Sequence, residues 1–433
     1  MPIMPIILKY NKIIKIVVIF FVSSFLFNPA FLYSQSLLSL DNLVNEAKKN
    51  NPEILAGKKR WDASLARIPQ AKSLENPNIG FTFEKIQKGT LKLDKTMPED
   101  RMLLFTQFLP FFGKLPLKGK IAVVESQMAA VEYKNTELKI INQLKNTYYD
   151  LFMNYKEIEL KKWSYKLLEG IAKVAEANYA LKDMSQEDVY KIHAEIASLN
   201  NDIMNLRQEN KAKHTRINTL LNRDPEELLP GIPDLTENFN FNEDIKLLYQ
   251  LTLHNQPELL LFSYSIEKNK HAKSLAKRSF FPDLMAGITQ RGITSGALGA
   301  WDLMLSFTVP LWFWTKQRYE VKEAVANLEE AEAAYKAMRN NAFSEVKDLS
   351  TKIEIAGNKI RLYKNSLIPI LESSISSSLA SFRSGKGDFM MLLDSERMLI
   401  ETRMNYYKAL VEYNMNLADI EKTVGINFNE VKK

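Results

Sequence analysis

The sequence predicts a mainly α-helical protein with a small transmembrane β part, in which a strand pair and a long helical hairpin occur twice. Two observations lead to this fold class. Short motifs of the first half return about 200 residues later in the same order. Each copy also combines alternating apolar and polar residues with an unusually long stretch that lacks proline. One elongated body made of two similar halves therefore fits the length of 433 residues.

The duplication is carried by short motifs at matching positions. The motif NPEI at residues 51–54 returns as QPEL at 256–259, and QFLPF at 107–111 returns as FTVPL at 307–311. A chain that repeats short strands between very long helices is unusual for a soluble enzyme. This pattern is expected of a tubular assembly built from repeated elongated units.

The N-terminal residues predict export. Lys9, Lys12 and Lys15 precede the apolar run Ile16–Leu26, and small residues follow at 28–30, which is the pattern of a secretory signal peptide. The apolar run is well below the roughly 20 residues that a spanning helix needs. An uncleaved inner-membrane anchor is the alternative. The sequence predicts this division: signal peptide 1–34; first repeat 35–221, with strands at about 77–86 and 101–109; linker 222–243; second repeat 244–425, with strands at about 283–291 and 300–309; C-terminal tail 426–433.

The first predicted helix covers residues 40–74 and is interrupted at Asn51-Pro52, before Asn76-Pro77 ends it. The strands follow it. In both copies apolar residues alternate with polar ones, so that one side of each strand is apolar and the other mostly polar. In a membrane the apolar side would face lipid and the polar side would line a lumen. The residues predicted to face lipid are Ile79, Phe81, Phe83, Trp301, Leu303, Leu305 and Phe307.

Very long helices follow each strand pair. No proline occurs from residue 117 to 181, a stretch that would reach roughly 95 Å as a helix. Apolar residues at alternating spacings of three and four, as at Leu144, Tyr148 and Leu151, predict coiled-coil seams in antiparallel helix pairs. Aromatic residues just beyond the strands, at 108–112 and 312–314, are typical of a membrane-interface belt, with ordinary packing as the alternative.

Four strands cannot close a barrel, and hydrocarbon does not tolerate open strand edges. We therefore predict that the chain assembles with itself, because three copies would supply 12 strands for a closed barrel with an aqueous lumen.

Composition excludes several other classes of protein. The chain has no cysteine, hence no disulfide, thiolate metal site or cysteine nucleophile. The net charge of +7 is spread along the chain, and no basic-aromatic module indicates nucleic-acid binding. The four histidines lack ligand spacing. We predict no enzyme activity, no cofactor and no metal site.

These residues resemble the TolC-type outer-membrane efflux protein family. The resemblance covers residues 40–425 and rests on the motif at 51–53, the run from Gln107 to Lys114, the motif at 309–311, and the turns at 181–188 and 382–394. It implies a homotrimer with a 12-stranded barrel in the outer membrane and an α-helical barrel in the periplasm. It also implies an inner-membrane pump and a periplasmic adaptor protein as partners. The run from Gln107 to Lys114 is most similar to the heavy-metal cation branch.

The two turns at the periplasmic end are the candidate adaptor-docking tips. They comprise Lys182, Asp183, Met184, Ser185, Ser384, Gly385, Lys386 and Gly387. In the first turn, Ser185 and Asp188 are spaced as in a capping box, although Asp replaces the usual Glu. The alternative is that these residues only terminate helices.

Three further residues are candidates for the tunnel entrance and its gating. The resemblance implies that Asp394 narrows the entrance and that Asp188 tethers neighbouring helices. Three copies of a carboxylate around an axis would form an anionic ring; a surface carboxylate near a helix start is the alternative. Phe382 occupies a position where the family often has tyrosine, and Gly387 one where some members have the arginine partner of the tether, which puts the closed-state latch in doubt. Lys386, one residue away, could substitute for that arginine.

The function predicted from the sequence is that of a passive outer-membrane exit duct, which passes drugs or metal cations from the periplasm to the exterior. The outer-membrane component of a type I protein-secretion system is one alternative. A periplasmic coiled-coil scaffold without a pore is another.

Overall fold

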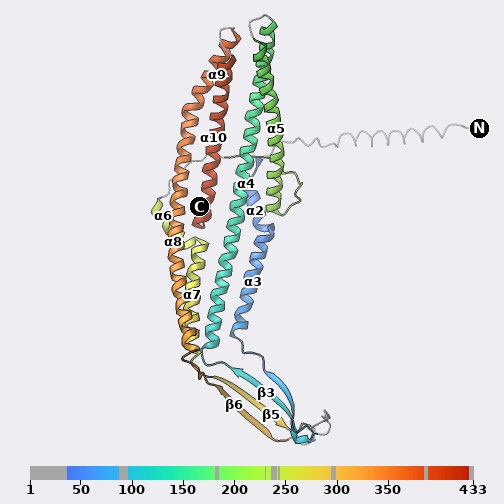
Figure 1. The fold of residues 1–433 in the computed structure, drawn as a ribbon, viewed down its shortest axis with the longest axis vertical. Coiled ribbons are helices and arrows are strands. Elements are labelled where there is room, and N and C mark those ends of the chain that lie inside the picture. Colours follow the sequence, from blue (N-terminus) through green and yellow to red (C-terminus); the bar gives the residue numbers. More distant parts are fainter. Residues whose placement is uncertain are drawn as a thin grey trace, which may run out of the picture.

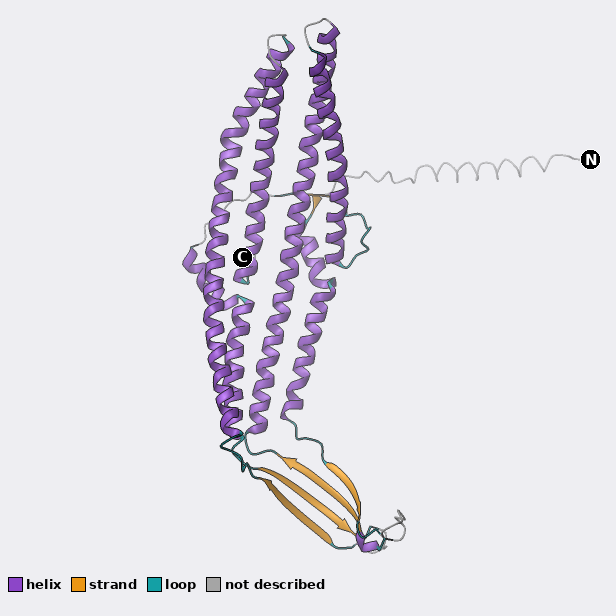
Figure 2. Ribbon diagram, viewed as in Figure 1, coloured by secondary structure: helices purple, strands orange, loops and turns teal. Residues whose placement is uncertain are grey.

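The computed structural model describes residues 37–86, 96–180, 185–229, 231–235, 241, 244–293, 299–384 and 389–428. The predicted signal peptide lies outside these residues. The molecule is elongated (Figure 1): the helices run along its long axis and a four-stranded sheet extends from one end. The long helices of each pair end at the opposite end of the molecule (Figure 2).

The two halves repeat one order of elements. The first half contains α2 (Leu40–Asn50), α3 (Pro52–Lys72), β2 (Asn78–Phe83), β3 (Arg101–Leu109), α4 (Lys114–Ala180) and α5 (Gln186–Leu221). The second half contains α6 (Ile245–Asn255), α7 (Pro257–Arg278), β5 (Asp283–Arg291), β6 (Trp301–Thr308), α8 (Gln317–Leu362), a π-helical turn (Tyr363–Leu367), α9 (Ile368–Arg383) and α10 (Phe389–Val424). A two-residue parallel pair, β1 (Leu37–Leu38) with β4 (Ile232–Pro233), and a 3₁₀ turn at Pro98–Asp100 complete the described elements.

The repeated NPE and QPE motifs mark places where two helices meet end to end. Asn51 caps α3, because its Oδ1 accepts the N–H groups of Glu53 and Ile54 at 2.9 and 3.2 Å. Its Nδ2 donates to the carbonyl oxygen of Leu220 at 2.9 Å, so α3 continues the line of α5. The residue after α5, Asn222, is left-handed with φ 58°. The sequence motif therefore encodes a joint between helices about 170 residues apart.

The second copy builds the same joint between α10 and α7. Gly425 follows α10 with φ +85°, and its amide and that of Ile426 donate to the carbonyl oxygen of Glu421. A Cβ at Gly425 would lie 2.2 Å from the carbonyl oxygen of Asn255, just before α7. Only glycine permits both the left-handed backbone and this close approach.

The sheet has the order β2-β3-β5-β6, and all its neighbours are antiparallel. β2 ends at Phe83, earlier than the predicted residue 86. Lys85 has φ 49° and so cannot continue a strand. Its ammonium group lies 2.9 Å from a carboxylate oxygen of Asp100, which fixes this reversal.

The core follows α4, which contacts α2, α3, α5, α7 and α10. Leu144, Tyr148 and Leu151 of its predicted seam are almost fully buried. The Tyr148 hydroxyl donates to the carbonyl oxygen of Leu38 at 2.7 Å and accepts the N–H of Asp234 at 2.9 Å. One side chain thus secures the short β1–β4 pair against the long helix. Among the described helices, none is both long and apolar enough to cross a bilayer.

Candidate functional site

The apolar sides of all four strands lie on one face of the sheet. The register pairs Ile79 with Phe105, Phe105 with Ile288, and Ile288 with Leu303. Paired residues of an antiparallel sheet point to the same side. The resulting apolar face consists of Ile79, Phe81, Phe83, Arg101, Leu103, Phe105, Gln107, Leu109, Leu284, Ala286, Ile288, Gln290, Trp301, Leu303, Leu305 and Phe307.

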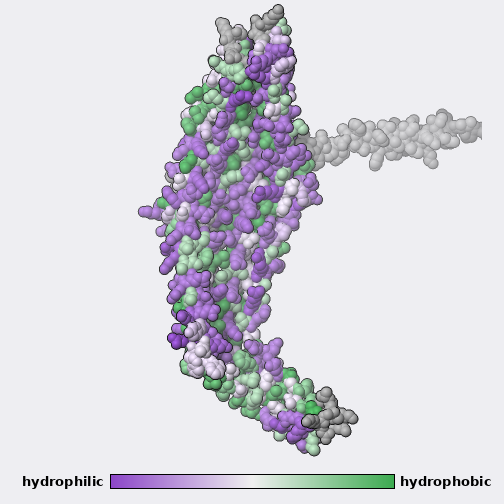
Figure 3. Space-filling view, viewed as in Figure 1, coloured by the Kyte–Doolittle hydropathy of each residue, from purple (hydrophilic) through white to green (hydrophobic). Residues whose placement is uncertain are grey.

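This apolar face is uncovered in the single chain. The residues predicted to face lipid are all exposed, from 37% for Phe83 to 73% for Leu303. Figure 3 shows hydrophobic residues gathered over the sheet, whereas the helical body is mainly hydrophilic on the side in view. A continuous exposed apolar surface marks contact with a membrane or another protein.

The two outer strands of the sheet have open edges. β2 and β6 each pair on one side only within the four-stranded sheet. Unpaired N–H and C=O groups along such edges are satisfied by water or by another strand. Four strands with an apolar face therefore form an incomplete surface that another sheet can extend.

A polar clamp joins the sheet to the helices. A carboxylate oxygen of Asp283, at the start of β5, accepts the N–H of Phe111 at 2.7 Å and lies 2.7 Å from the ammonium nitrogen of Lys114. Arg278 donates to the carbonyl oxygen of Phe112 at 2.6 Å. A Cβ at Gly113 would lie 2.4 Å from the Arg278 guanidinium, and its φ of +86° also favours glycine. Gly113 and Lys114, which end the run from Gln107 to Lys114, therefore hold the sheet against the helices. The sequence did not indicate that Asp283 is the partner of Lys114.

At the first tip, Ser185 caps α5 as its spacing to Asp188 predicts. Its Oγ accepts the N–H of Asp188 at 3.1 Å and donates to the Asp188 carboxylate at 2.6 Å. Ser384 is exposed and ends α9. Of the other predicted docking residues, Lys182, Asp183, Met184, Gly385, Lys386 and Gly387 lie outside the described residues. Adaptor docking by these residues stays a prediction.

The candidate entrance residues lie near the tips but in different environments. Asp394 is an exposed residue of α10, on the other hairpin from Asp188. The ring of Phe382 is only 5% exposed and packs in an apolar cluster with Leu168, Ile192 and Leu392. The three predicted residues are thus distributed over three helices, with Phe382 in the core of the single chain.

A buried carboxyl group that the sequence reasoning missed connects the two hairpins in this region. Glu396 of α10 is 3% exposed and accepts a hydrogen bond from the hydroxyl of Ser164 of α4. Burial raises the pKa of the Glu396 carboxyl, as does the charge of Glu195, while the Ser164 hydrogen bond and the charge of Arg397 oppose the rise. Arg397 is itself 3.0 Å from Glu195. No spacing in the sequence indicates which acidic residue of α10 is buried.

We expect the stability of the helical body to fall as the pH rises through the raised pKa of Glu396. The folded state holds this proton more tightly than the unfolded state, so raising the pH above the ordinary carboxyl range of about 4.3 favours unfolding. Glu396→Gln should flatten this dependence, measured as the thermal midpoint between pH 4 and pH 8. Glu401→Gln, at an exposed residue of the same helix, is the control and should leave the slope unchanged. An unchanged slope in Glu396→Gln would contradict the assignment.

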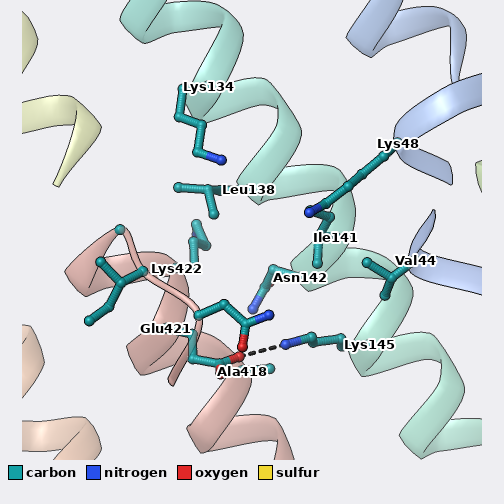
Figure 4. Close-up of a pocket in the computed structure, with 13 residues that line it drawn as sticks. Val44, Lys48, Lys134, Leu138, Ile141, Asn142, Lys145, Ala418, Glu421 and Lys422 are labelled. Atoms are coloured by element: carbon teal, nitrogen blue, oxygen red, sulfur yellow. Dashed lines mark hydrogen bonds and ion pairs between the residues drawn. The ribbon is translucent and has the colours of Figure 1, made fainter. Parts of the chain in front are cut away.

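A cavity of about 300 Å³ is lined by residues of α2, α4 and α10. Figure 4 shows Lys48, Lys134, Lys145 and Lys422 around it, with Lys145 paired to Glu421 at 2.5 Å. Lys48 and Lys134 lie 3.5 and 3.4 Å from the one carboxylate of Glu137. Ion pairs therefore already engage three of the four lysines, and the cluster connects the two halves of the chain.

Within the described ranges, no group of three or more His, Cys, Asp or Glu side chains could hold a metal ion. His193 and His271 each lie near a single glutamate, Glu176 at 3.1 Å and Glu267 at 3.8 Å.

A family model described as outer membrane efflux protein matches residues 248–425. Nodulation protein T of Rhizobium leguminosarum bv. trifolii is 20% identical over 409 residues, which cover 91% of this chain and 87% of that protein. The cobalt-zinc-cadmium resistance protein CzcC of Cupriavidus metallidurans is 18% identical over 390 residues, 90% of each chain.

Solved structures share the fold. The outer membrane protein VceC of Vibrio cholerae superposes with a TM-score of 0.76 at 17% identity, covering 90% of this chain and 96% of that one. CusC, whose structures report on transmembrane channel formation, superposes with a TM-score of 0.77 at 16% identity. The match covers 90% of this chain and 92% of that one. The mainly helical architecture with one four-stranded sheet is therefore that of outer-membrane channels.

Proposed function

Because this chain belongs to the outer membrane efflux protein family, we propose that it forms a passive trimeric exit duct across the outer membrane. The observation that carries this proposal is the uncovered apolar face of the sheet, bounded by two open strand edges. Three copies of the four-stranded sheet supply twelve strands. Pairing β6 of one copy with β2 of the next closes a barrel and leaves no edge in the hydrocarbon.

In such a barrel the apolar face meets lipid and the opposite face lines the lumen. The opposite face carries Asp302, Ser306 and Thr308 of β6, paired with Thr289, Met285 and Asp283 of β5. Water fills a barrel of this size and solvates polar side chains such as Asp302, Ser306 and Thr289. The helical bodies of three copies then continue the lumen as a tunnel in the periplasm.

Energy for transport comes from partners in this proposal. The helix tips bind a periplasmic adaptor protein, which connects the duct to an inner-membrane pump. Opening is a shift between two packings of the tip helices, biased by the partner that binds one packing more tightly. Phe382 contributes through its burial between α4, α5 and α10, because moving α9 outward exposes its ring.

The cargo is a small molecule or a metal cation. The similarity to a protein named for cobalt, zinc and cadmium resistance supports the metal cation. An anionic ring of three Asp394 carboxylates at the entrance concentrates cations there.

The proposal is tested by reconstituting the mature chain into planar bilayers and nanodiscs. We expect discrete single-channel currents and a trimer that requires detergent for solubility. Cysteines placed at Leu303 and Phe81 of neighbouring copies report whether β6 approaches β2. A monomer that stays soluble without detergent and carries no current would support the scaffold alternative instead.

We expect Asp394→Asn to raise the conductance and to weaken block by multivalent cations, because it removes three charges from the entrance in one substitution. The readouts are the single-channel current and its titration with hexamminecobalt. Glu401→Asn, two turns further along α10, is the matched control. Unchanged conductance and unchanged block in Asp394→Asn would remove this residue from the entrance.

A further inference from the structure

We propose that the joint between sheet and helices holds one inner-leaflet phospholipid per chain. An acyl chain lies in an apolar cavity at the end of the sheet, and the phosphate lies beside Lys72 and Lys120. The inference rests on the proposed function, because it requires the sheet to cross a membrane.

The apolar cavity has a volume of about 540 Å³, within the range of small-molecule sites, about 300–1,000 Å³. Leu109, Leu284 and Phe307 form its wall on the sheet side. The register pairs Leu109 with Leu284 and Leu284 with Phe307, so all three belong to the apolar face. The cavity therefore opens on the side of the sheet that meets lipid.

A second cavity of about 770 Å³ adjoins the first on the helix side, and Leu115 and Pro116 line both. Lys72 and Lys120 contribute its positive charge. Neither lysine forms an ion pair within the described part of the chain, and both are exposed. The one carboxylate that lines this second cavity belongs to Glu267, and it lies 3.8 Å from the ring of His271, one turn along the same helix.

Lys72 is held at this position by a close approach to α4. A Cβ at Gly119 would lie 2.6 Å from Cγ of Lys72, so the lysine stem lies directly on the helix where only glycine leaves space. Long lysine side chains commonly lay an apolar stem on the protein and present the charge to a polar group.

The order of the two cavities along the molecule matches the polarity of one lipid. From sheet to helices come the apolar face, the apolar cavity, the two lysines and then the helical body. Inner-leaflet acyl chains would lie toward the sheet, and their phosphates toward the periplasmic helices. Exposed aromatic residues, Phe112 at 88% and Trp312 at 66%, follow β3 and β6 at this same joint, as residues at a membrane interface do. Charge complementarity favours an anionic headgroup such as phosphatidylglycerol.

The test uses the mature trimer in nanodiscs that contain a phosphatidylglycerol analogue with a photoreactive acyl chain. Mass spectrometry maps the labelled peptides, and the phosphatidylglycerol retained after detergent extraction is counted. We expect labelling of residues 109–116 in excess over the strands. Lys72→Glu/Lys120→Glu should lower this labelling and the retained lipid at least about ten-fold, since each basic residue near an anionic lipid contributes about five-fold. Lys118→Glu, an exposed lysine of α4 that lines neither cavity, should change neither.

Each other outcome overturns the proposal in a recognisable way. Even labelling along the apolar face, unchanged in Lys72→Glu/Lys120→Glu, leaves the barrel intact and removes the site. Labelling that occurs on the strands but is absent from residues 109–116 shows that no acyl chain occupies the cavity. A chain that does not insert into nanodiscs overturns the proposed function together with this inference.

Discussion

Leu305→Arg is expected to abolish outer-membrane assembly of the protein. Leu305 lies in the middle of β6, on the apolar face, and is 59% exposed in the single chain. An arginine at the bilayer midplane costs about 2–4 kcal/mol per copy, and a closed trimer pays this three times. The measurement is the amount of heat-modifiable trimer in the outer-membrane fraction.

The adjacent residue provides a matched control for this prediction. Ser306 pairs with Met285 on the opposite face of the sheet, so Ser306→Arg places the same charge in the aqueous lumen. We expect a near-normal trimer yield from Ser306→Arg, with an altered ion selectivity. Equal tolerance of the two arginines would refute the assignment of the two faces, and with it the barrel.

The second large effect is expected from Asp283→Ala at the clamp between sheet and helices. The substitution removes the acceptor of the Phe111 N–H and leaves Lys114, only 12% exposed in its side chain, without its carboxylate. Losing one partner of a buried ion pair costs about 3–5 kcal/mol, and partial exposure of this pair reduces the loss to about 2–3 kcal/mol. The readout is the urea midpoint of the protein in detergent, followed by circular dichroism.

Two comparisons separate the clamp from a general effect of charge removal. Lys114→Met together with Asp283→Ala should recover part of the loss, because no unpaired ammonium group remains. Asp62→Ala removes an exposed pair with Lys59, with side-chain exposures of 46% and 69%, and should cost less than about 1 kcal/mol. A loss from Asp283→Ala no larger than that from Asp62→Ala would show that the clamp contributes little.

Much of the fold follows from local patterns in the sequence. The break at Asn51-Pro52, the cap at Ser185 and the burial of Leu144 and Tyr148 match the expectations, because propensity, capping and helical spacing act within a few residues. The ends of the strands are predicted less accurately from the sequence. β2 stops at Phe83 because the left-handed backbone at Lys85 and its contact with Asp100 terminate it.

The candidate site is only partly predictable in the same way. Alternation identifies the apolar side of each strand, including Leu303 and Leu305, but says nothing of which strands are neighbours. The buried pair of Glu396 with Ser164 joins residues 232 positions apart. The residues next to an acidic side chain on an amphipathic helix do not indicate whether it is buried against a distant hydroxyl group.

Patterns along the chain are enough to predict the duplication, the long helices and the two faces of each strand. The duplication is a repeat of motifs in the same order, and the helices and strands depend on periods of about 3.6 and of two residues. The tertiary structure alone decided how these parts meet. Register brings four apolar sides onto one face, Asn51 joins α3 to α5, and Asp283 fastens the sheet to α4. The contacts of Asn51 and Asp283 connect residues about 170 positions apart, so their partners are selected by packing in space rather than by any pattern along the chain.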